Sequence, residues 1–152
     1  MKILMVCLGN ICRSPLACGI LKQHLRKLRI DAEVDSAGFE PYHIGDEADE
    51  RAQKVAGEHG IDLSAHRARL FRKEDFDNYD RIYVMDDTNY QDVMFMARSE
   101  ADRKKVDYIM NVVNPGKNEA VPDPYYGGYF KFKEVYELLD QACLGISESI
   151  KK

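Results

Sequence analysis

The chain has 152 residues, of which 45% are hydrophobic and 32% charged, and this composition predicts a single globular domain over residues 1–152. Its longest apolar run, residues 3–8, is far shorter than the roughly 18 residues of a membrane-spanning helix and lacks the features of a signal peptide. A net charge of −4 argues against a protein whose main task is to bind nucleic-acid phosphates. We therefore expect a cytoplasmic monomer with no membrane or nucleic-acid partner.

The hydrophobic pattern predicts four strands that alternate with helices. In chain order we expect a strand at residues 2–7, a helix at 14–29, a strand at 32–36, a helix at 46–58, a strand at 81–85, a helix at 88–97, a strand at 106–113 and a helix at 129–150. Ser14 and Pro15 mark the start of the first helix, with Ser14 as its N-cap, and Gly60 ends the second.

This alternation is typical of the α/β class. We expect a three-layer sandwich in which a four-stranded parallel sheet carries helices on both faces. Residues 114–128 contain three prolines and three glycines. Because this segment is too long for a simple connection, we expect it to be a functional loop.

The cysteines are too few for a disulfide scaffold, and their spacing does not match a zinc site. They are Cys7, Cys12, Cys18 and Cys143. We expect neither a metal nor a cofactor. In a reducing compartment, a cysteine in an unusual sequence context is better interpreted as a nucleophile.

The segment after the first strand has the features of a phosphate-binding loop. Cys7 ends that strand, and five residues separate it from Arg13 at the start of the next helix. A loop of this size can direct backbone N–H groups and a helix dipole at a tetrahedral anion, and Gly9 and Asn10 tolerate the positive φ angles that it needs. The predicted phosphate-binding residues are Leu8, Gly9, Asn10, Ile11, Cys12, Arg13 and Ser14.

The same loop predicts a nucleophilic thiolate. The backbone N–H groups, the helix dipole and Arg13 stabilise negative charge on the sulfur of Cys7, and the Ser14 hydroxyl can add a hydrogen bond. Arg13 can bind two phosphate oxygens with its planar fork, which lysine cannot do. Phosphoryl transfer to sulfur also needs a proton donor for the leaving oxygen. Asp123, held between two prolines in the long loop, is the best candidate.

At this point the sequence resembles a known family. Residues 7–15, CLGNICRSP, are similar to the signature of the low-molecular-weight protein tyrosine phosphatases, and residues 123–125, DPY, resemble that family's general-acid loop. The likeness covers essentially the whole chain. Other similar segments are Asp35-Ser36-Ala37-Gly38, Tyr42-His43, Gly45, Asp49-Glu50-Arg51-Ala52 and Met85-Asp86.

The resemblance implies a phosphatase that hydrolyses phosphotyrosine in proteins or peptides, and small aryl phosphates, through a covalent phosphocysteine intermediate. It implies that Cys7 is the nucleophile, that Arg13 binds the phosphate and that Asp123 is the acid and then the base. Three residues match polar positions that brace the phosphate loop in the family, and Ser14 joins them as a fourth supporting residue. The three are Asn10, Ser36 and His66.

Aromatic residues are expected to wall the substrate pocket. Tyr42, Tyr125 and Tyr126 can form a slot that accepts the phenyl ring of phosphotyrosine. Compared with many family members, Tyr42 replaces a tryptophan and Phe39 replaces a threonine. Both residues lie in the segment expected to line the pocket, so they bear on substrate preference.

Cys12 has two possible roles. It lies in the same loop as Cys7, so it is a candidate redox partner that would form a disulfide with an oxidised Cys7. Alternatively, it is only a small residue that fits a tight loop.

Two alternative functions remain from the sequence: an arsenate reductase of the same fold, and a phosphotyrosine-binding module without turnover. The reductase needs a redox cysteine pair near residues 80–95, where this chain has Tyr83 and Tyr90. A silent binding module would be expected to lose Cys7 or Asp123. Cysteine-phosphorylated sugar-transport components, a third class, lack an arginine six residues after the cysteine.

Overall fold

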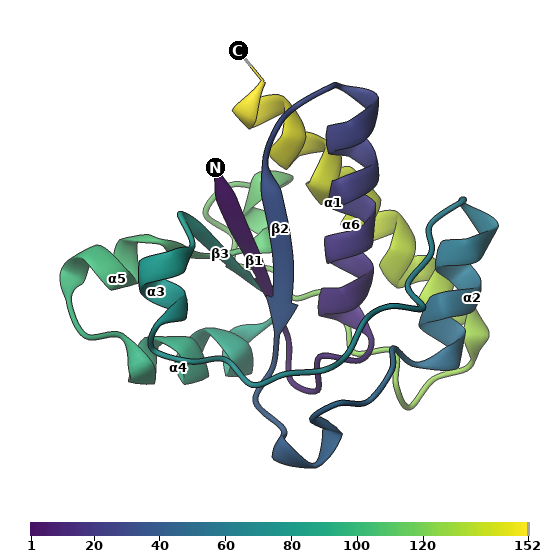
Figure 1. Ribbon diagram of the computed structural model, residues 1–152, viewed down its shortest axis with the longest axis horizontal. Helices are drawn as coiled ribbons and strands as arrows, with labels where there is room; N and C mark the ends of the chain where they lie inside the picture. Colours follow the sequence, from purple (N-terminus) through teal and green to yellow (C-terminus); the bar gives the residue numbers. More distant parts are fainter. Residues whose placement is uncertain (152) are drawn as a thin grey trace.

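The computed structural model describes residues 1–151, and its centre is a parallel sheet with the strand order β2-β1-β3-β4 (Figure 1). The strands are β1 (Lys2–Val6), β2 (Glu33–Ala37), β3 (Arg81–Val84) and β4 (Val106–Tyr108). Val6 pairs with Ala37 on one side and with Val84 on the other. Because these strand ends stand level, the loops that follow β1, β2 and β3 emerge at one edge of the sheet.

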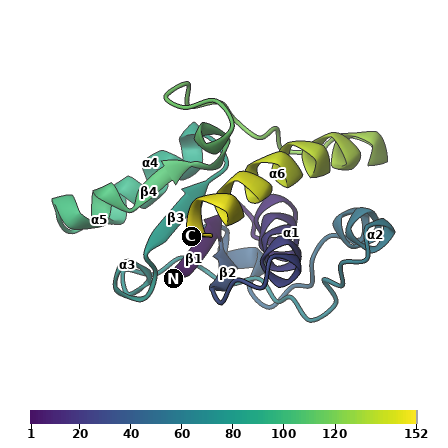
Figure 2. The same cartoon turned by 90° about the horizontal axis from the view of Figure 1, so that it is seen from above.

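Helices cover both faces of the sheet, so the predicted three-layer α/β architecture is confirmed. One face is covered by α1 (Arg13–Lys27), α2 (Glu50–Glu58) and α6 (Tyr129–Ile150), which lie together in Figure 2. The other face is covered by α3 (Asp75–Asn78) and α4 (Asp87–Met96), and α5 (Glu100–Lys104) packs beside β4. Within residues 1–151, every helix is too short or too polar to cross a lipid bilayer.

The side chains of β1 enter both layers of the core. Ile3 and Met5 belong to the cluster under α1 and α6, whereas Leu4 and Val6 belong to the cluster under α3 and α4. All four are fully buried. Since successive residues of a strand face opposite sides, a strand covered on both faces is apolar throughout, which explains the unbroken hydrophobic run at the start of the chain.

The helix expected at residues 46–58 begins later than predicted. α2 starts at Glu50, because the side chain of Asp49 accepts the backbone N–H of Arg51 and caps the helix there. Asp46 is held outside the helix, where its carbonyl accepts the backbone N–H of Ala68 at 2.8 Å. This pairing across the chain overrides the acidic pattern from which the longer helix was predicted.

The strand expected at residues 106–113 is also too long. β4 ends at Tyr108 and continues as a 3-10 helix, Ile109–Val112. Within residues 1–151, β4 pairs with β3 alone, and the last paired residues are Val84 and Tyr108, so the segment after Tyr108 has no strand there with which to pair. The short elements α3, α5 and the 3-10 turn Pro41–His43 were not predicted, because none is long enough for a periodic pattern.

The first helix begins at Arg13, one residue before the predicted start, and no side chain caps it. The expectation that Ser14 is its N-cap is wrong. Its hydroxyl instead bonds with Cys7 and Asn10, in the loop that leads into the helix.

Candidate active site

Cys7 lies between the end of β1 and the start of α1. The segment that joins these two elements lies below the sheet in Figure 1. The residue is 2% exposed. Its Sγ atom accepts the backbone N–H groups of Asn10 at 3.3 Å and Ser14 at 3.4 Å, and the Ser14 Oγ lies 3.0 Å away. These dipoles all favour a negative sulfur over a neutral one.

Asn10 holds the loop in this curved form. Its φ angle is +56°, in the left-handed region that asparagine tolerates better than most residues. The side-chain Nδ2 donates to the hydroxyls of Ser14 and Ser36, at 2.8 and 2.9 Å, and Oδ1 accepts the backbone N–H of Arg69. The side chain is completely buried, so these bonds satisfy both of its amide hydrogens.

His66 supports the same residue from outside the loop. Its Nε2 lies 2.6 Å from the backbone carbonyl of Asn10 and donates to it. Burial lowers the pKa of His66, while the hydrogen bond to Asn10 acts in the opposite direction. The imidazole is therefore neutral at pH 7 and carries its proton on Nε2.

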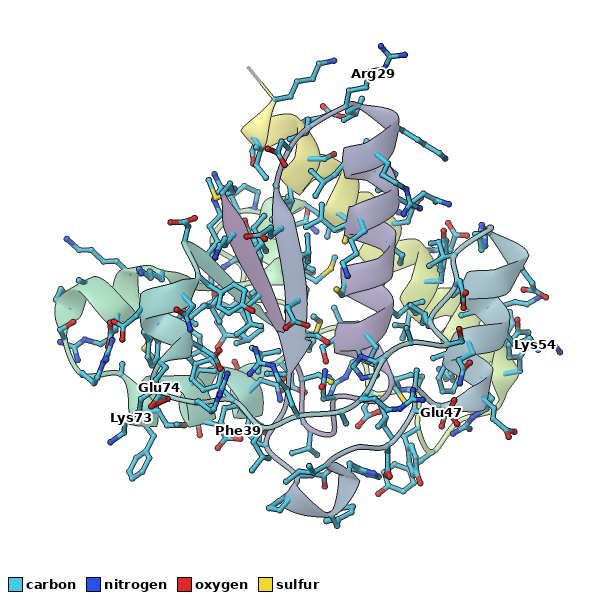
Figure 3. The ribbon with its side chains drawn as sticks, viewed as in Figure 1. Arg29, Phe39, Glu47, Lys54, Lys73 and Glu74 are labelled. Carbon is cyan, nitrogen blue, oxygen red and sulfur yellow. The ribbon has the colours of Figure 1, made fainter. Side chains whose placement is uncertain are left out.

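The end of β2 packs directly against the loop. A Cβ atom at Gly38 would lie 2.9 Å from the backbone N of Asn10 and 2.9 Å from the carbonyl oxygen of Leu8. No side chain larger than hydrogen fits at Gly38 without moving the loop. Phe39, which follows β2 (Figure 3), lies in the segment that was expected to line the pocket. Its ring stacks on Phe71 instead and does not line the pocket.

Arg13 is held by hydrogen bonds at one end of its guanidinium group. NH1 donates to the Asp86 carboxylate at 2.7 Å and to the carbonyl of Val121 at 2.9 Å. Within residues 1–151, Nε and NH2 make no hydrogen bond, and NH2 lies 3.6 Å from a carboxylate oxygen of Asp123. Burial alone would lower the pKa of Arg13, but the negative charges of Cys7 and Asp86 raise it, so the group is always charged.

Asp123 lies across the pocket from the phosphate loop, in a segment fixed to the end of β3. Val121 donates its backbone N–H to the carbonyl of Met85 at 2.7 Å. The Asp123 Oδ1 accepts the backbone N–H of Tyr125 at 3.1 Å, and the side chain is 36% exposed. The carboxyl group is therefore oriented by its own loop and still open to the pocket.

A pocket of about 170 Å³ opens over Cys7, Arg13 and Asp123. The three tyrosines predicted to form its walls do line it, and they are partly or largely exposed. The Tyr42 hydroxyl donates to the Glu40 carboxylate, and this hydrogen bond raises the pKa of Tyr42 to about 12. Besides Tyr42, Tyr125 and Tyr126, the other lining residues are Leu8, Gly9, Ile11, Cys12, Glu40 and His43.

Cys12 is buried beside the pocket as a free thiol. Burial and the nearby charges of Asp49, Cys7 and Asp123 raise its pKa well above the usual value. Cys12 is thus a neutral thiol at physiological pH.

Sequence reasoning assigned no role to three residues that shape this site. Asp86 and Arg51 fall in segments that resemble the family, but nothing in those segments indicates that Asp86 holds Arg13 or that Arg51 contacts the loop of Asp123. Glu40 carries no sequence signal at all. Asp86 and Arg51 act through contacts between segments far apart in the chain, which a single sequence does not reveal, whereas Glu40 acts on Tyr42, two residues away.

Comparison with known proteins places the chain among phosphatases. The family model described as low molecular weight phosphotyrosine protein phosphatase matches residues 2–152. The human low molecular weight phosphotyrosine protein phosphatase is 36% identical over 149 residues, which cover 97% of this chain and 94% of the relative.

Solved structures agree. A protein tyrosine phosphatase from Entamoeba histolytica, crystallised with Hepes in its active site, is 36% identical with a TM-score of 0.89 and covers 96% of this chain and 94% of its own. A Drosophila arginine phosphatase is 31% identical with a TM-score of 0.92, covering 100% and 99%. The chain therefore belongs to the low molecular weight phosphotyrosine protein phosphatases and is a protein tyrosine phosphatase.

Proposed function

We propose that Cys7, Arg13 and Asp123 carry out the hydrolysis of phosphotyrosine without a metal or organic cofactor. The observation that carries this proposal is the arrangement at the base of the pocket, where two backbone N–H groups point at the sulfur of Cys7. Arg13 and Asp123 line the same pocket, with 3.6 Å between their charged groups. A nucleophile, an oxyanion clamp and a proton donor thus converge on one small volume.

In the first step, the Cys7 thiolate attacks phosphorus, and the bond between phosphorus and the tyrosine oxygen breaks. The free N–H groups on Nε and NH2 of Arg13 bind two phosphate oxygens, because NH1 is already occupied by Asp86 and Val121. Asp123, in its protonated form, gives its proton to the leaving phenolate oxygen.

In the second step, Asp123 acts as a base. Its carboxylate takes a proton from a water molecule, and the oxygen of that water attacks the phosphorus of phosphocysteine. The sulfur–phosphorus bond breaks, inorganic phosphate forms and the Cys7 thiolate returns to the pattern of donors that stabilised it at the start.

The family implies phosphotyrosine-containing substrates, and we infer that the three tyrosines at the pocket recognise their aromatic ring. Tyr125 and Tyr126 meet edge to face, with ring centroids 5.1 Å apart, and Tyr42 is fixed by Glu40. Such walls accept a flat phenyl ring and leave a short phosphoserine side chain far from the sulfur.

We also propose that residues 1–152 act as one catalytic domain, as a monomer in the cytoplasm, without membrane or nucleic-acid partners. Two features support a reducing compartment: the four cysteines are free thiols, and the proposed nucleophile is active only as a thiolate. The net charge of −4 supports the absence of a nucleic-acid partner.

The proposed pocket predicts selectivity for phosphotyrosine. A peptide carrying phosphotyrosine is expected to give a kcat/KM on the order of 100-fold higher than the matched phosphoserine peptide, measured by phosphate release with a metal chelator present throughout. A phosphoarginine peptide forms the third arm, because an arginine phosphatase shares this fold. Comparable rates on phosphoserine, or a faster rate on phosphoarginine, would contradict the proposed slot.

Replacement of the nucleophile tests the covalent step. Cys7→Ser is expected to lose at least about 10⁴-fold in kcat, because a serine hydroxyl is a far weaker nucleophile at neutral pH. Rapid quench with labelled substrate should trap phosphate on the wild-type chain and not on the variant. Circular dichroism and binding of inorganic phosphate check that the fold and the loop persist. Turnover by Cys7→Ser at a rate near wild type would rule out the mechanism.

The role of Asp123 predicts a dependence on the leaving group. Asp123→Asn is expected to lose about 100-fold or more on phosphotyrosine, whose oxygen needs a proton, and less than about 10-fold on dinitrophenyl phosphate, whose oxygen does not. Glu119→Gln, an exposed carboxylate change in the same loop, is the matched control. Equal losses on both substrates would mean that Asp123 supports structure and not proton transfer.

Cys12 predicts reversible oxidation. We propose that peroxide converts Cys7 to a sulfenic acid with release of water, and that the Cys12 thiol then displaces a second water to form a disulfide. The high pKa of Cys12 makes this second step slow at neutral pH. In excess peroxide, which oxidises an unprotected sulfenic acid further to a sulfinic acid that thiols do not reduce, activity should return with a thiol reductant in wild type and not in Cys12→Ser. Equal recovery of both, or a bridge to Cys18 or Cys143, would leave Cys12 with a packing role.

A further inference from the structure

Arg51, in the first turn of α2, binds the loop that carries Asp123. Its NH1 group donates to the carbonyl of Gly127 at 3.0 Å, and NH2 donates to the carbonyl of Tyr125 at 3.0 Å. Both carbonyls follow Asp123 within four residues. Tyr125 is also the residue whose backbone N–H bonds the Asp123 carboxylate. Arg51 thus binds the carbonyl of the same residue whose backbone N–H orients the proposed acid.

The rest of the guanidinium is fixed as firmly. Nε and NH2 form a fork on the two oxygens of the Asp49 carboxylate, each at 3.0 Å. The Cζ atom lies 4.5 Å from the ring centroid of the buried Phe132 in α6, and 5.6 Å from that of Tyr125. A flat cation that forks on a carboxylate and stacks on a ring has one available orientation, which lysine cannot reproduce.

Asp49 connects this arrangement to the phosphate loop. Its backbone N–H donates to the carbonyl of Ile11 at 2.8 Å, and Ile11 lies between Asn10 and Cys12 in that loop. Asp49 and Arg51 therefore form a bridge with one end on the loop of Cys7 and the other end on the loop of Asp123. In Figure 3, the labelled residue Glu47 lies in the segment that leads into α2, and Lys54 lies on the outer side of that helix.

The exposed position of Asp123 makes such a bridge necessary. Pro122 and Pro124 restrict its backbone, but the segment from Pro122 to Gly128 contains no helix or strand. Within residues 1–151, its own side-chain hydrogen bond is the local one to Tyr125. An error of about 1 Å in the position of a proton donor is enough to slow a reaction substantially.

We propose that Arg51 is a positioning residue for proton transfer, which sets the location of the Asp123 carboxyl group relative to the phosphate loop. This inference rests on the proposed role of Asp123 as general acid. Arg51 itself does not touch the reacting atoms. It acts through Tyr125 and Gly127, and its effect should be largest for substrates whose leaving oxygen needs a proton.

The test is a leaving-group series with Arg51→Gln and Arg51→Lys. The quantity to compare is kcat/KM, because it reports the steps up to phosphocysteine formation even when hydrolysis of that intermediate limits kcat. On phenyl phosphate or phosphotyrosine, both variants are expected to lose roughly 10-fold or more, and on dinitrophenyl phosphate less than about 3-fold. Arg103→Gln, which removes an exposed arginine of α5, should match wild type on both.

A structural role alone predicts a different result. Loss of folded protein lowers the rate on every aryl phosphate by the same factor and lowers the melting temperature in proportion. Equal losses across the series, or full activity of Arg51→Lys, would overturn the inference. If Arg51→Gln fails to fold, Arg51→Lys still places a positive charge beside the Asp49 carboxylate, and the leaving-group series with this variant decides the question alone.

A double variant separates this inference from the proposed mechanism. On phenyl phosphate, Asp123→Asn with Arg51→Gln should be no slower than Asp123→Asn by itself, because both changes act on one proton transfer. A multiplied loss would show that Arg51 acts elsewhere and would overturn the inference. If Asp123→Asn alone shows no dependence on the leaving group, the assignment of the acid fails first, and the role of Arg51 fails with it.

Discussion

The phosphate loop turns backbone N–H groups inward. Its carbonyl groups therefore point outward into the protein, where each needs a hydrogen-bond donor. The structure meets this demand from three separate places in the chain. The carbonyl of Leu8 accepts the N–H of Phe39, that of Asn10 accepts His66, and that of Ile11 accepts Asp49. The donors that hold the carbonyl groups of this loop thus lie up to 56 positions away in the sequence.

The same demand explains why the region between β2 and α2 has little regular structure. Residues 38–49 run across the mouth of the site, supply N–H groups to the loop at Phe39 and Asp49, and place Glu40 and Tyr42 at the pocket wall. In a continuous helix over residues 46–58, the N–H of Asp49 would bond to a carbonyl of the preceding helical turn and not to that of Ile11. The late start of α2 is therefore a consequence of the site.

Sequence patterns predicted most of the fold and part of the candidate site. The apolar runs of β1 and β3 and the long stripe of α6 reflect local periodicity, so their positions were predicted within one or two residues. The spacing of Cys7 and Arg13 also encodes a local geometry. The hydrogen bond expected between the Ser14 hydroxyl and Cys7 is present, but the N-cap role expected for Ser14 was wrong, because capping is a local rule and the curvature of the loop directs this hydroxyl to Cys7 and Asn10. The contacts of Asp86 and Arg51 are long-range and leave no mark on spacing.

The donors around Cys7 recognise the oxygens of a phosphate group and nothing of the tyrosine attached to it. The N–H groups of Asn10 and Ser14 and the free end of Arg13 are therefore as complementary to the product as to the substrate. Under the proposed mechanism, we expect free inorganic phosphate to compete for the site and, if it binds only the folded chain, to stabilise the fold as its concentration rises. We therefore expect turnover to slow as orthophosphate accumulates, which would link the activity of the protein to the phosphate level of its surroundings.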